Sequence, residues 1–257
     1  MRGLKNHLII ATLFLYKIAR SSNNKMESFV VNGDFAKIKQ YPHCVFLVVN
    51  CRGKWICGSS VINQKILLTA AHCLYCASTN PKIDAFAGHE NIKQTSVNRA
   101  VKKVLIHDKY SDRNVNSDIG LVMLSEDLPL GKKIKRVILV KQSNYGLSAV
   151  VAGWGAISDE PERGTDTLKW ANQKVRSEKT CTKLGKLKPG MMCAGSTSKE
   201  HPRPSKGDSG SALITADYQQ IGIVSYRLVT YPGLVVYTNV SYYYDWIKEK
   251  SRLMYCG

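Results

Sequence analysis

The sequence predicts an all-β protein with one helix at its C-terminal end. Apolar runs of about four to eight residues recur along the chain, they are rich in Val, Ile and Leu, and Gly, Asn, Pro or Asp bound them. Strands at such spacing are typical of barrels or sandwiches, and not of a sheet that alternates with helices. With 257 residues and 44% hydrophobic composition, the chain is long enough to bury a full core.

The strongest strand candidates are spread over the whole chain. They are Cys44–Asn50, Trp55–Ile62, Ile66–Leu68, Ile119–Leu124, Val150–Trp154, Ser211–Thr215, Gln220–Tyr226 and Leu234–Val240. One helix is expected over about 242–252, because Tyr243, Trp246, Ile247 and Lys250 alternate apolar and charged positions at a period near 3.6. Ser241 is suited to cap its first turn.

The first residues have the layout of a secretory signal. Arg2 and Lys5 precede an apolar run over 8–16, which Lys17 ends, and small residues follow. Such a run is far shorter than the roughly 20 residues that a membrane-spanning helix needs. We therefore expect residues 1–20 to be a cleaved signal peptide, no membrane span, and a secreted, extracellular protein.

The formal net charge of +18 includes basic clusters at 132–136 and at Lys183, Lys186 and Lys188. A positive surface attracts polyanions or acidic substrates. Binding of a polyanion through this surface is one expectation, and a merely solvated basic face is the other. The sequence contains no nucleic-acid recognition motif, so we expect no specific nucleic-acid binding.

Eight cysteines in an exported chain predict disulfides before metal ligands. Cys73 and Cys76 have the CxxC spacing of zinc and redox sites, but no second CxxC or paired histidine follows at zinc-finger spacing. We therefore expect neither a metal nor a cofactor.

Three polar segments beside apolar strands carry the residue types of nucleophilic catalysis. His72 follows one strand, Asp118 precedes another, and Ser209 lies in the glycine-flanked turn 207–210. A serine hydroxyl needs a neighbouring base, histidine exchanges protons near neutral pH, and a buried carboxylate orients the imidazole. Each residue alone fits a packed histidine, a strand cap or a tight turn. Together, in the order His, Asp, Ser, they indicate a serine hydrolase.

An oxyanion that forms during such a reaction needs main-chain donors. Gly207 can turn its N–H toward the same point as the N–H of Ser209. We expect these two groups to form the oxyanion hole.

Segments 69–73, 118–121 and 207–213 resemble the three signature segments of the chymotrypsin/trypsin family of serine peptidases. Shorter matches run along nearly the whole chain after residue 29, at 30–33, 153–155, 192–195 and 245–247. The resemblance implies a peptidase domain over 30–257, built of two six-stranded antiparallel β-barrels and a C-terminal helix. Barrel one, about 30–135, would supply His72 and Asp118, and barrel two, about 136–240, would supply Ser209.

The resemblance also implies disulfides. Cys57 and Cys73 match a bridge beside the catalytic histidine, and Cys181 and Cys193 match one in the second barrel. Four cysteines remain, and spacing allows three pairings among them. We favour Cys51–Cys76 together with Cys44–Cys256.

Activation is implied to depend on a new N-terminus. Members of this family are cleaved after Arg or Lys, and the freed α-amine pairs with the acid beside the nucleophile. Here that pair would be Val30 and Asp208, which makes residues 21–29 a short propeptide. In this chain Phe29, and not Arg or Lys, precedes the peptide bond that would be cleaved to free Val30. The activating protease is then chymotrypsin-like, or activation differs.

The specificity pocket departs from the family pattern. Ser205 and the segment 225–237 lack the usual pair of bridged cysteines, and Arg203 occupies the position where trypsin-like enzymes hold an acid. Arg203 is expected near the pocket floor, Ser225, Tyr226 and Arg227 on its wall, and Lys206 at its mouth. Three positive charges exclude efficient cleavage after Lys or Arg. Such charges must face water, pair with local acids or await an anionic group. One expectation is that they bind an acidic substrate side chain, and the other is that Arg227 fills the entrance and leaves weak activity toward small residues.

The sequence therefore predicts a secreted, monomeric serine endopeptidase that cleaves proteins or peptides through an acyl-enzyme on Ser209, with non-trypsin-like specificity. The alternative is a catalytically weak or inactive homologue that acts as a binding or regulatory module. The presence of all three catalytic residue types favours the enzyme.

Overall fold

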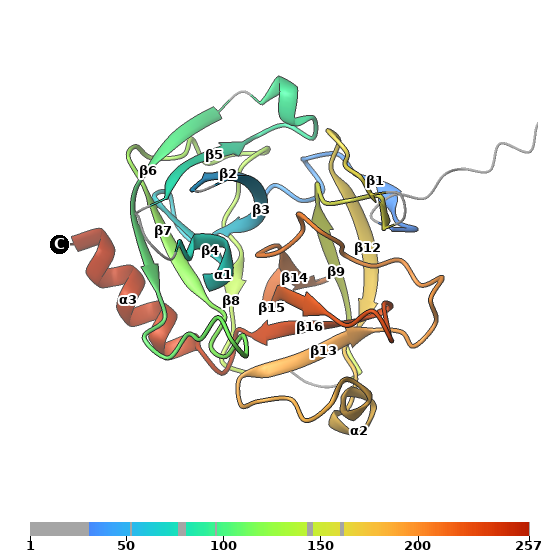
Figure 1. Cartoon of the computed structure of the whole chain (residues 1–257). Helices are drawn as coiled ribbons and strands as arrows, with labels where there is room; N and C mark the ends of the chain where they lie inside the picture. Colours follow the sequence, from blue (N-terminus) through green and yellow to red (C-terminus); the bar gives the residue numbers. More distant parts are fainter. Residues whose placement is uncertain are drawn as a thin grey trace, which may run out of the picture.

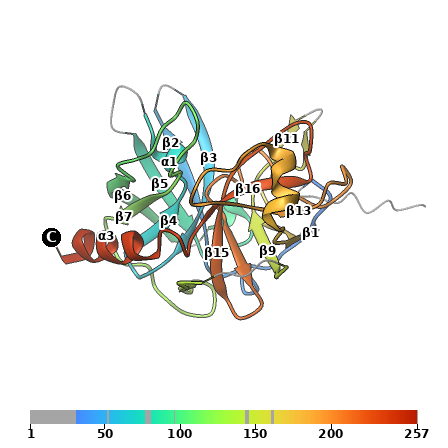
Figure 2. The ribbon, with the colours of Figure 1, turned by 90° about the horizontal axis from the view of Figure 1, so that it is seen from below.

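The structure is a computed structural model, and it describes residues 31–51, 53–76, 81–95, 97–142, 146–159 and 162–256. The expected signal peptide and propeptide, and Val30, lie outside the described residues. Two β-sheet halves lie beside one another, and the last helix lies against the first half (Figure 1; Figure 2). Within the described residues, none of the helices has the length and hydropathy needed to cross a membrane.

The first half is a closed antiparallel barrel in the order β2-β3-β4-β7-β6-β5. Its strands are β2 (Cys44–Asn50), β3 (Lys54–Val61), β4 (Ile66–Thr69), β5 (Lys82–Ala87), β6 (Val97–Ile106) and β7 (Gly120–Leu124). Alternate residues of β2, namely Val45, Leu47 and Val49, are fully buried in the barrel core, as period-2 patterning requires. The full burial of β4 and β7 makes a rigid base for the residues that follow β4 and precede β7.

The second half is a sheet in the order β1-β12-β9-β14-β15-β16-β13, with β8 added in parallel to β15. Its strands are β1 (Asp34–Phe35), β8 (Ile138–Leu139), β9 (Ser148–Gly153), β12 (Lys169–Lys174), β13 (Met191–Gly195), β14 (Ala212–Thr215), β15 (Gln219–Arg227) and β16 (Leu234–Asn239). A bridge between Val175 and Ala194 joins the chain after β12 to β13. The six-strand run from β12 to β13 therefore curves back on itself, in agreement with the predicted second barrel.

The boundary between the halves differs from the prediction. The prediction assigned the chain from residue 30 to the first barrel, whereas β1 pairs with β12 of the second sheet. The edge of β12 has main-chain groups that need a partner, and β1 supplies it through the pairs Asp34–Trp170 and Phe35–Lys169. The start of the described chain is thereby held on the second half.

Helices and short elements complete the described fold. They are α1 (Ala71–Leu74), α2 (Glu178–Cys181), α3 (Tyr244–Cys256), the 3-10 turns η1 (Ile92–Gln94) and η2 (Thr182–Leu184), and the hairpin strands β10 (Ser158–Asp159) and β11 (Glu162–Arg163). The predicted terminal helix exists, but it begins and ends later than 242–252. Ile247 and Met254 of α3 are buried in the same apolar cluster as the core of the first barrel. The helix therefore packs along that barrel.

The two halves pack through a separate apolar cluster. Phe46 of β2 contacts Trp154, which follows β9, edge to face with ring centroids 5.7 Å apart. Leu168 and Ile214 join this cluster from the second half. The packed interface fixes the relative position of the residues that each half contributes to the site.

Three disulfides are present among the described residues: Cys51–Cys76, Cys57–Cys73 and Cys181–Cys193. The preferred Cys44–Cys256 pairing is wrong, because both thiols are free. Cys44 is buried between the halves, with its Sγ 3.8 Å from the carbonyl oxygen of Ala152, whereas Cys256 is exposed at the end of α3.

Candidate active site

His72 is held by the first barrel on both sides. It lies in α1, the single turn that follows β4, between the buried residues Ala71 and Cys73. Cys73 is bonded to Cys57 of β3, and its carbonyl oxygen accepts from the indole N–H of Trp55 at 3.3 Å. The turn is thereby tied to β3, and the imidazole projects toward the second half.

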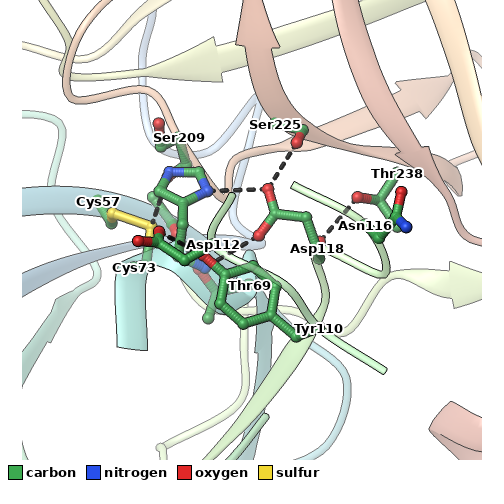
Figure 3. A network of polar contacts seen from close by, with 12 residues as sticks. Cys57, Thr69, Cys73, Tyr110, Asp112, Asn116, Asp118, Ser209, Ser225 and Thr238 are labelled. Atoms are coloured by element: carbon green, nitrogen blue, oxygen red, sulfur yellow. Dashed lines mark hydrogen bonds and ion pairs between the residues drawn. A yellow bond between two sulfur atoms is a disulfide. The ribbon is translucent and has the colours of Figure 1, made fainter. Parts of the chain in front are cut away.

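Asp118 lies two residues before the start of β7, and its side chain is 1% exposed. Its carboxylate accepts from the main-chain N–H of His72 at 2.9 Å, from Nδ1 of the same residue at 2.8 Å, and from the Ser225 hydroxyl at 2.5 Å. Thr238 fixes the main chain by donating to the carbonyl oxygen of Asp118 at 2.7 Å. Figure 3 shows the carboxylate between the imidazole and Ser225. This arrangement orients the ring and leaves Nε2 facing away from Asp118.

Ser209 is placed by a turn that requires glycine. Gly207 and Gly210 have φ of 98° and 84°, in the left-handed region. A Cβ at Gly210 would lie 2.1 Å from Oγ1 of Thr69 and 2.3 Å from the carbonyl oxygen of Gly58. Gly58 in turn donates its N–H to the carbonyl oxygen of Ser209 at 2.7 Å. The turn before β14 is therefore docked on the first barrel beside α1.

The sulfur of Cys73 shows that the imidazole and Ser209 are neighbours. It lies 3.9 Å from Nε2 of His72 and 3.6 Å from the carbonyl oxygen of Ser209. Nε2, the ring nitrogen that does not bind Asp118, therefore lies beside the Cys73 sulfur, next to the main chain of Ser209. The structure brings together the three residues that the sequence singled out.

The main chain beside Ser209 offers unused donors. In the part of the chain that the structure describes, the N–H groups of Gly207 and Ser209 donate to no other group. Both residues are partly exposed. These N–H groups are available to an oxyanion that forms beside Ser209.

Asp208 is fully buried behind the turn. Its carboxylate accepts from the N–H of Gly155 at 2.7 Å and from the N–H of Ser205 at 2.9 Å. Burial raises the pKa of Asp208 to about 6, although these two hydrogen bonds act in the opposite direction. The N–H of Arg203 donates to the carbonyl oxygen of Val31 at 3.0 Å, so the start of the described chain is bound to the segment that leads to this acid.

A cavity of about 350 Å³ opens beside Ser209. Its lining is Pro204, Ser205, Lys206, Ser209, Val224, Ser225, Tyr226, Arg227, Val229 and Val235. Of the five predicted pocket residues, Lys206, Ser225, Tyr226 and Arg227 line it. Arg203, expected near the pocket floor, is not among the lining residues, and its side chain is 8% exposed.

The positive charges of the pocket have partners within the protein. Asp159 of β10 accepts hydrogen bonds from Arg203 at 2.9 Å, from Ser205 at 2.6 Å, and from Arg227. Lys206 pairs with Glu162 of β11 at 2.9 Å, in an exposed position. Neither acid was predicted from the sequence. Only their charge, in a stretch between two glycines at 155 and 164, offered a signal.

One group of potential metal ligands is found among the described residues. Ligand atoms of Cys57, His72 and Cys73 lie within 4.8 Å of one another. The two sulfurs are bonded to each other, so neither is available to a metal. Cys73 and Cys76, the CxxC pair, belong to two different disulfides.

Comparison with known proteins agrees with this geometry. The Trypsin family model matches residues 30–247. Chymotrypsin of Phaedon cochleariae is 34% identical over 87% of this chain and 82% of its own length. Human kallikrein-14 is 27% identical over 96% of this chain and 94% of its own length.

Solved structures show the same fold. A structure of HL collagenase has a TM-score of 0.76, with 22% identity, over 86% of this chain and 98% of its own. The scabies mite inactivated protease paralogue S-D1 has a TM-score of 0.78, also with 22% identity, over 86% of this chain and 97% of its own. The match of the family model over most of the chain, together with the two-half β fold, shows that this protein belongs to the trypsin family of serine proteases.

Proposed function

We propose that the chain is a serine endopeptidase with Ser209 as nucleophile, His72 as general base and acid, and Asp118 as the group that orients the imidazole. The observation that carries the proposal is the Asp118 carboxylate, which holds His72 by Nδ1 and by the main-chain N–H. Because Nδ1–H donates to Asp118, Nε2 is left as the basic nitrogen on the side of Ser209.

The reaction follows from these positions. Nε2 of His72 accepts the proton of Ser209 as Oγ attacks the carbonyl carbon of the scissile peptide bond. The N–H groups of Gly207 and Ser209 stabilise the oxyanion, and Asp118 stabilises the imidazolium. The imidazolium then protonates the leaving amine, and water hydrolyses the acyl-enzyme by the same steps.

The proposed specificity excludes basic residues before the scissile bond. Arg227 lines the cavity and would repel Lys or Arg of a substrate. Val224, Val229, Val235 and Tyr226 form much of the remaining lining. The pairing of both arginines with Asp159 weakens the case for an acidic substrate side chain. We therefore favour uncharged side chains.

Secretion and activation complete the proposal. Residues 1–20 are proposed as the signal peptide, and cleavage after Phe29 by a chymotrypsin-like activating protease would give an α-amine on Val30 for Asp208. Secretion and zymogen activation are typical of the family. The alternative, an inactive binding module, has a structural neighbour in the inactivated mite paralogue. The presence of all three residue types at 72, 118 and 209 and the hydrogen bond between His72 and Asp118 support the enzyme.

Hydrolysis by matched variants tests the assignment. Protein processed to begin at Val30 is assayed on a peptide library. Ser209→Ala and His72→Ala each lower kcat by about a thousandfold or more, because triad members act as a unit. Ser177→Ala, at an exposed serine, keeps wild-type kcat. Near wild-type turnover by either triad variant contradicts the proposal.

A further inference from the structure

The hairpin formed by β10 and β11 presents two acids on one face. Asp159 and Glu162 are direct partners in the hairpin, so their side chains point to the same side. Like charges in that arrangement repel each other unless cations neutralise them. Here the cations come from the cavity wall and mouth, since Asp159 binds Arg203 and Arg227 and Glu162 binds Lys206.

The hairpin is also anchored at the pocket by its main chain. The N–H of Ala156 donates to the carbonyl oxygen of Lys206 at 2.7 Å, and the N–H of Ile157 donates to the carbonyl oxygen of Arg163 at 2.7 Å. These bonds fix the base of the hairpin beside the cavity. The main chain of the hairpin therefore determines where the Asp159 carboxylate meets the two arginines.

Each carboxylate oxygen of Asp159 binds one of the two arginines. Oδ2 accepts from Nη2 of Arg203 at 2.9 Å, whereas Oδ1 accepts from Ser205 at 2.6 Å and from Nη2 of Arg227. Ser205 and Arg227, on different parts of the cavity lining, are thereby joined through one carboxylate. The Asp159 side chain is 27% exposed, so these bonds are largely shielded from water.

The buried positive charge of Arg203 is neutralised by Asp159. Its Nη1 donates to the carbonyl oxygens of Lys199 at 2.5 Å and His201 at 3.4 Å, and Asp159 provides its carboxylate partner. Among the described residues its Nε has no acceptor. A buried guanidinium without a counter-ion is costly, so the loss of Asp159 would leave a cation that favours another carboxylate.

We propose that Asp159 is a specificity-determining residue, an internal counter-ion that occupies Arg203 and Arg227 and so prevents the pocket from selecting acidic substrate side chains. This inference rests on the proposed function. An acidic side chain entering the cavity would have to displace a carboxylate of the same chain, which competes at high effective concentration. Without that carboxylate, a substrate Asp or Glu becomes the partner of the arginines.

The test compares matched hairpin variants. Asp159→Asn removes the charge at constant size, and Glu162→Gln does the same at the neighbouring acid, whose partner Lys206 is exposed. The readout is the ratio of kcat/KM for paired peptides with Glu or Gln before the scissile bond. A general loss of activity cancels in this ratio. We expect Asp159→Asn to raise the ratio about tenfold or more, and Glu162→Gln to leave it within about twofold.

Two further measurements keep the inference separate from folding and from catalysis. Arg227→Gln leaves Asp159 paired with Arg203 alone, and the ratio of kcat/KM for Lys over Gln peptides should rise several-fold. Binding of the same Glu and Gln peptides to Ser209→Ala, with and without Asp159→Asn, is measured by calorimetry. If no variant hydrolyses any peptide, the proposed function fails, while the binding ratio still tests Asp159. Equal ratios with and without Asp159→Asn overturn the inference.

Discussion

Asp118 accepts three hydrogen bonds through a carboxylate that is almost completely buried, and one of them comes from Ser225 at 2.5 Å. The sequence placed Ser225 in the specificity pocket, and it does line the cavity. Its bond to Asp118 escaped prediction because the two residues are 107 positions apart and only the packed interface brings them together. The predicted triad residues, in contrast, lie in short segments, and the order of these segments along the chain was enough to single them out.

The Ser225 hydroxyl should contribute to catalysis through Asp118. A hydrogen bond to a charged group contributes about 1.5–3 kcal/mol, so we expect Ser225→Ala to lower kcat by about tenfold or more. Thr238→Val is the matched control, since Thr238 donates to the main-chain carbonyl of Asp118 and not to its carboxylate. Steady-state kinetics on one peptide measure both. An equal kcat for Ser225→Ala and wild type would show that this bond does not act on the triad.

Asp159 could not be identified from the sequence as the partner of the pocket arginines. The two arginines were assigned to the pocket through the family resemblance, Arg203 by its position before Ser209 and Arg227 by its position after Ser225, and pairing with local acids was one expectation. The partner itself lies 44 residues before Arg203 and 68 before Arg227, on a two-residue strand. No spacing rule connects a short hairpin to a distant pocket, so the geometry alone identifies it.

At the scale of elements, the prediction succeeded where apolar residues dominate. β2 has the predicted bounds, and β3, β7, β9, β14, β15 and β16 differ from the expected ranges by one or two residues at either end. β12 was not predicted, because Lys169 and Gln173 occupy two of its buried positions and obscure the apolar pattern. β6 escaped because Arg99 occupies one of its half-buried positions, Ala100 is exposed, and Lys102 and Lys103 are adjacent, so apolar and polar residues do not alternate cleanly.

The predicted cysteine pairings were only partly correct. The Cys57–Cys73 and Cys181–Cys193 bridges, implied by the resemblance, lie within one half each. The wrong pairing joined Cys44, which lies between the halves, to Cys256, at the end of a helix that packs on the first barrel. Where α3 lies could not be deduced from the spacing of the cysteines.

For the whole molecule, the position of the segment that begins at Val31 is the feature that connects the fold to the proposed activation. β1 crosses to the second sheet, and Val31 is bound by the N–H of Arg203, five residues before Asp208. The two-half arrangement was predicted only through the resemblance, because strand spacing does not distinguish a barrel from a sandwich. Burial of Asp208 gives this arrangement a measurable consequence.

The uncleaved protein should lose stability as pH rises through the titration of Asp208. Its folded pKa of about 6 exceeds the value near 3.9 in an unfolded chain, so the folded state binds the extra proton between these pH values. The cost of ionising the buried group approaches roughly 3 kcal/mol at pH 7. A protonated α-amine on Val30 would offset it. Cleavage after Phe29 should therefore raise Tm by about 5 °C at pH 7 and by little at pH 4.

Calorimetry of the uncleaved and cleaved proteins at both pH values checks this expectation. A variant with Asp208→Asn serves as the control, since it removes the titrating group and should abolish the pH dependence of the difference. The same Tm difference at pH 4 and pH 7 in the wild-type protein would contradict the proposed ion pair.

One experiment tests whether Ser209 is a nucleophile activated by His72. The most direct measurement is the reaction of the protein processed to Val30 with a serine-directed fluorophosphonate, followed by mass spectrometry of the labelled peptide. We expect one label per chain on Ser209, and loss of labelling in Ser209→Ala and His72→Ala. No labelling of the processed wild-type protein, or a label that persists in His72→Ala at the wild-type rate, would contradict the account.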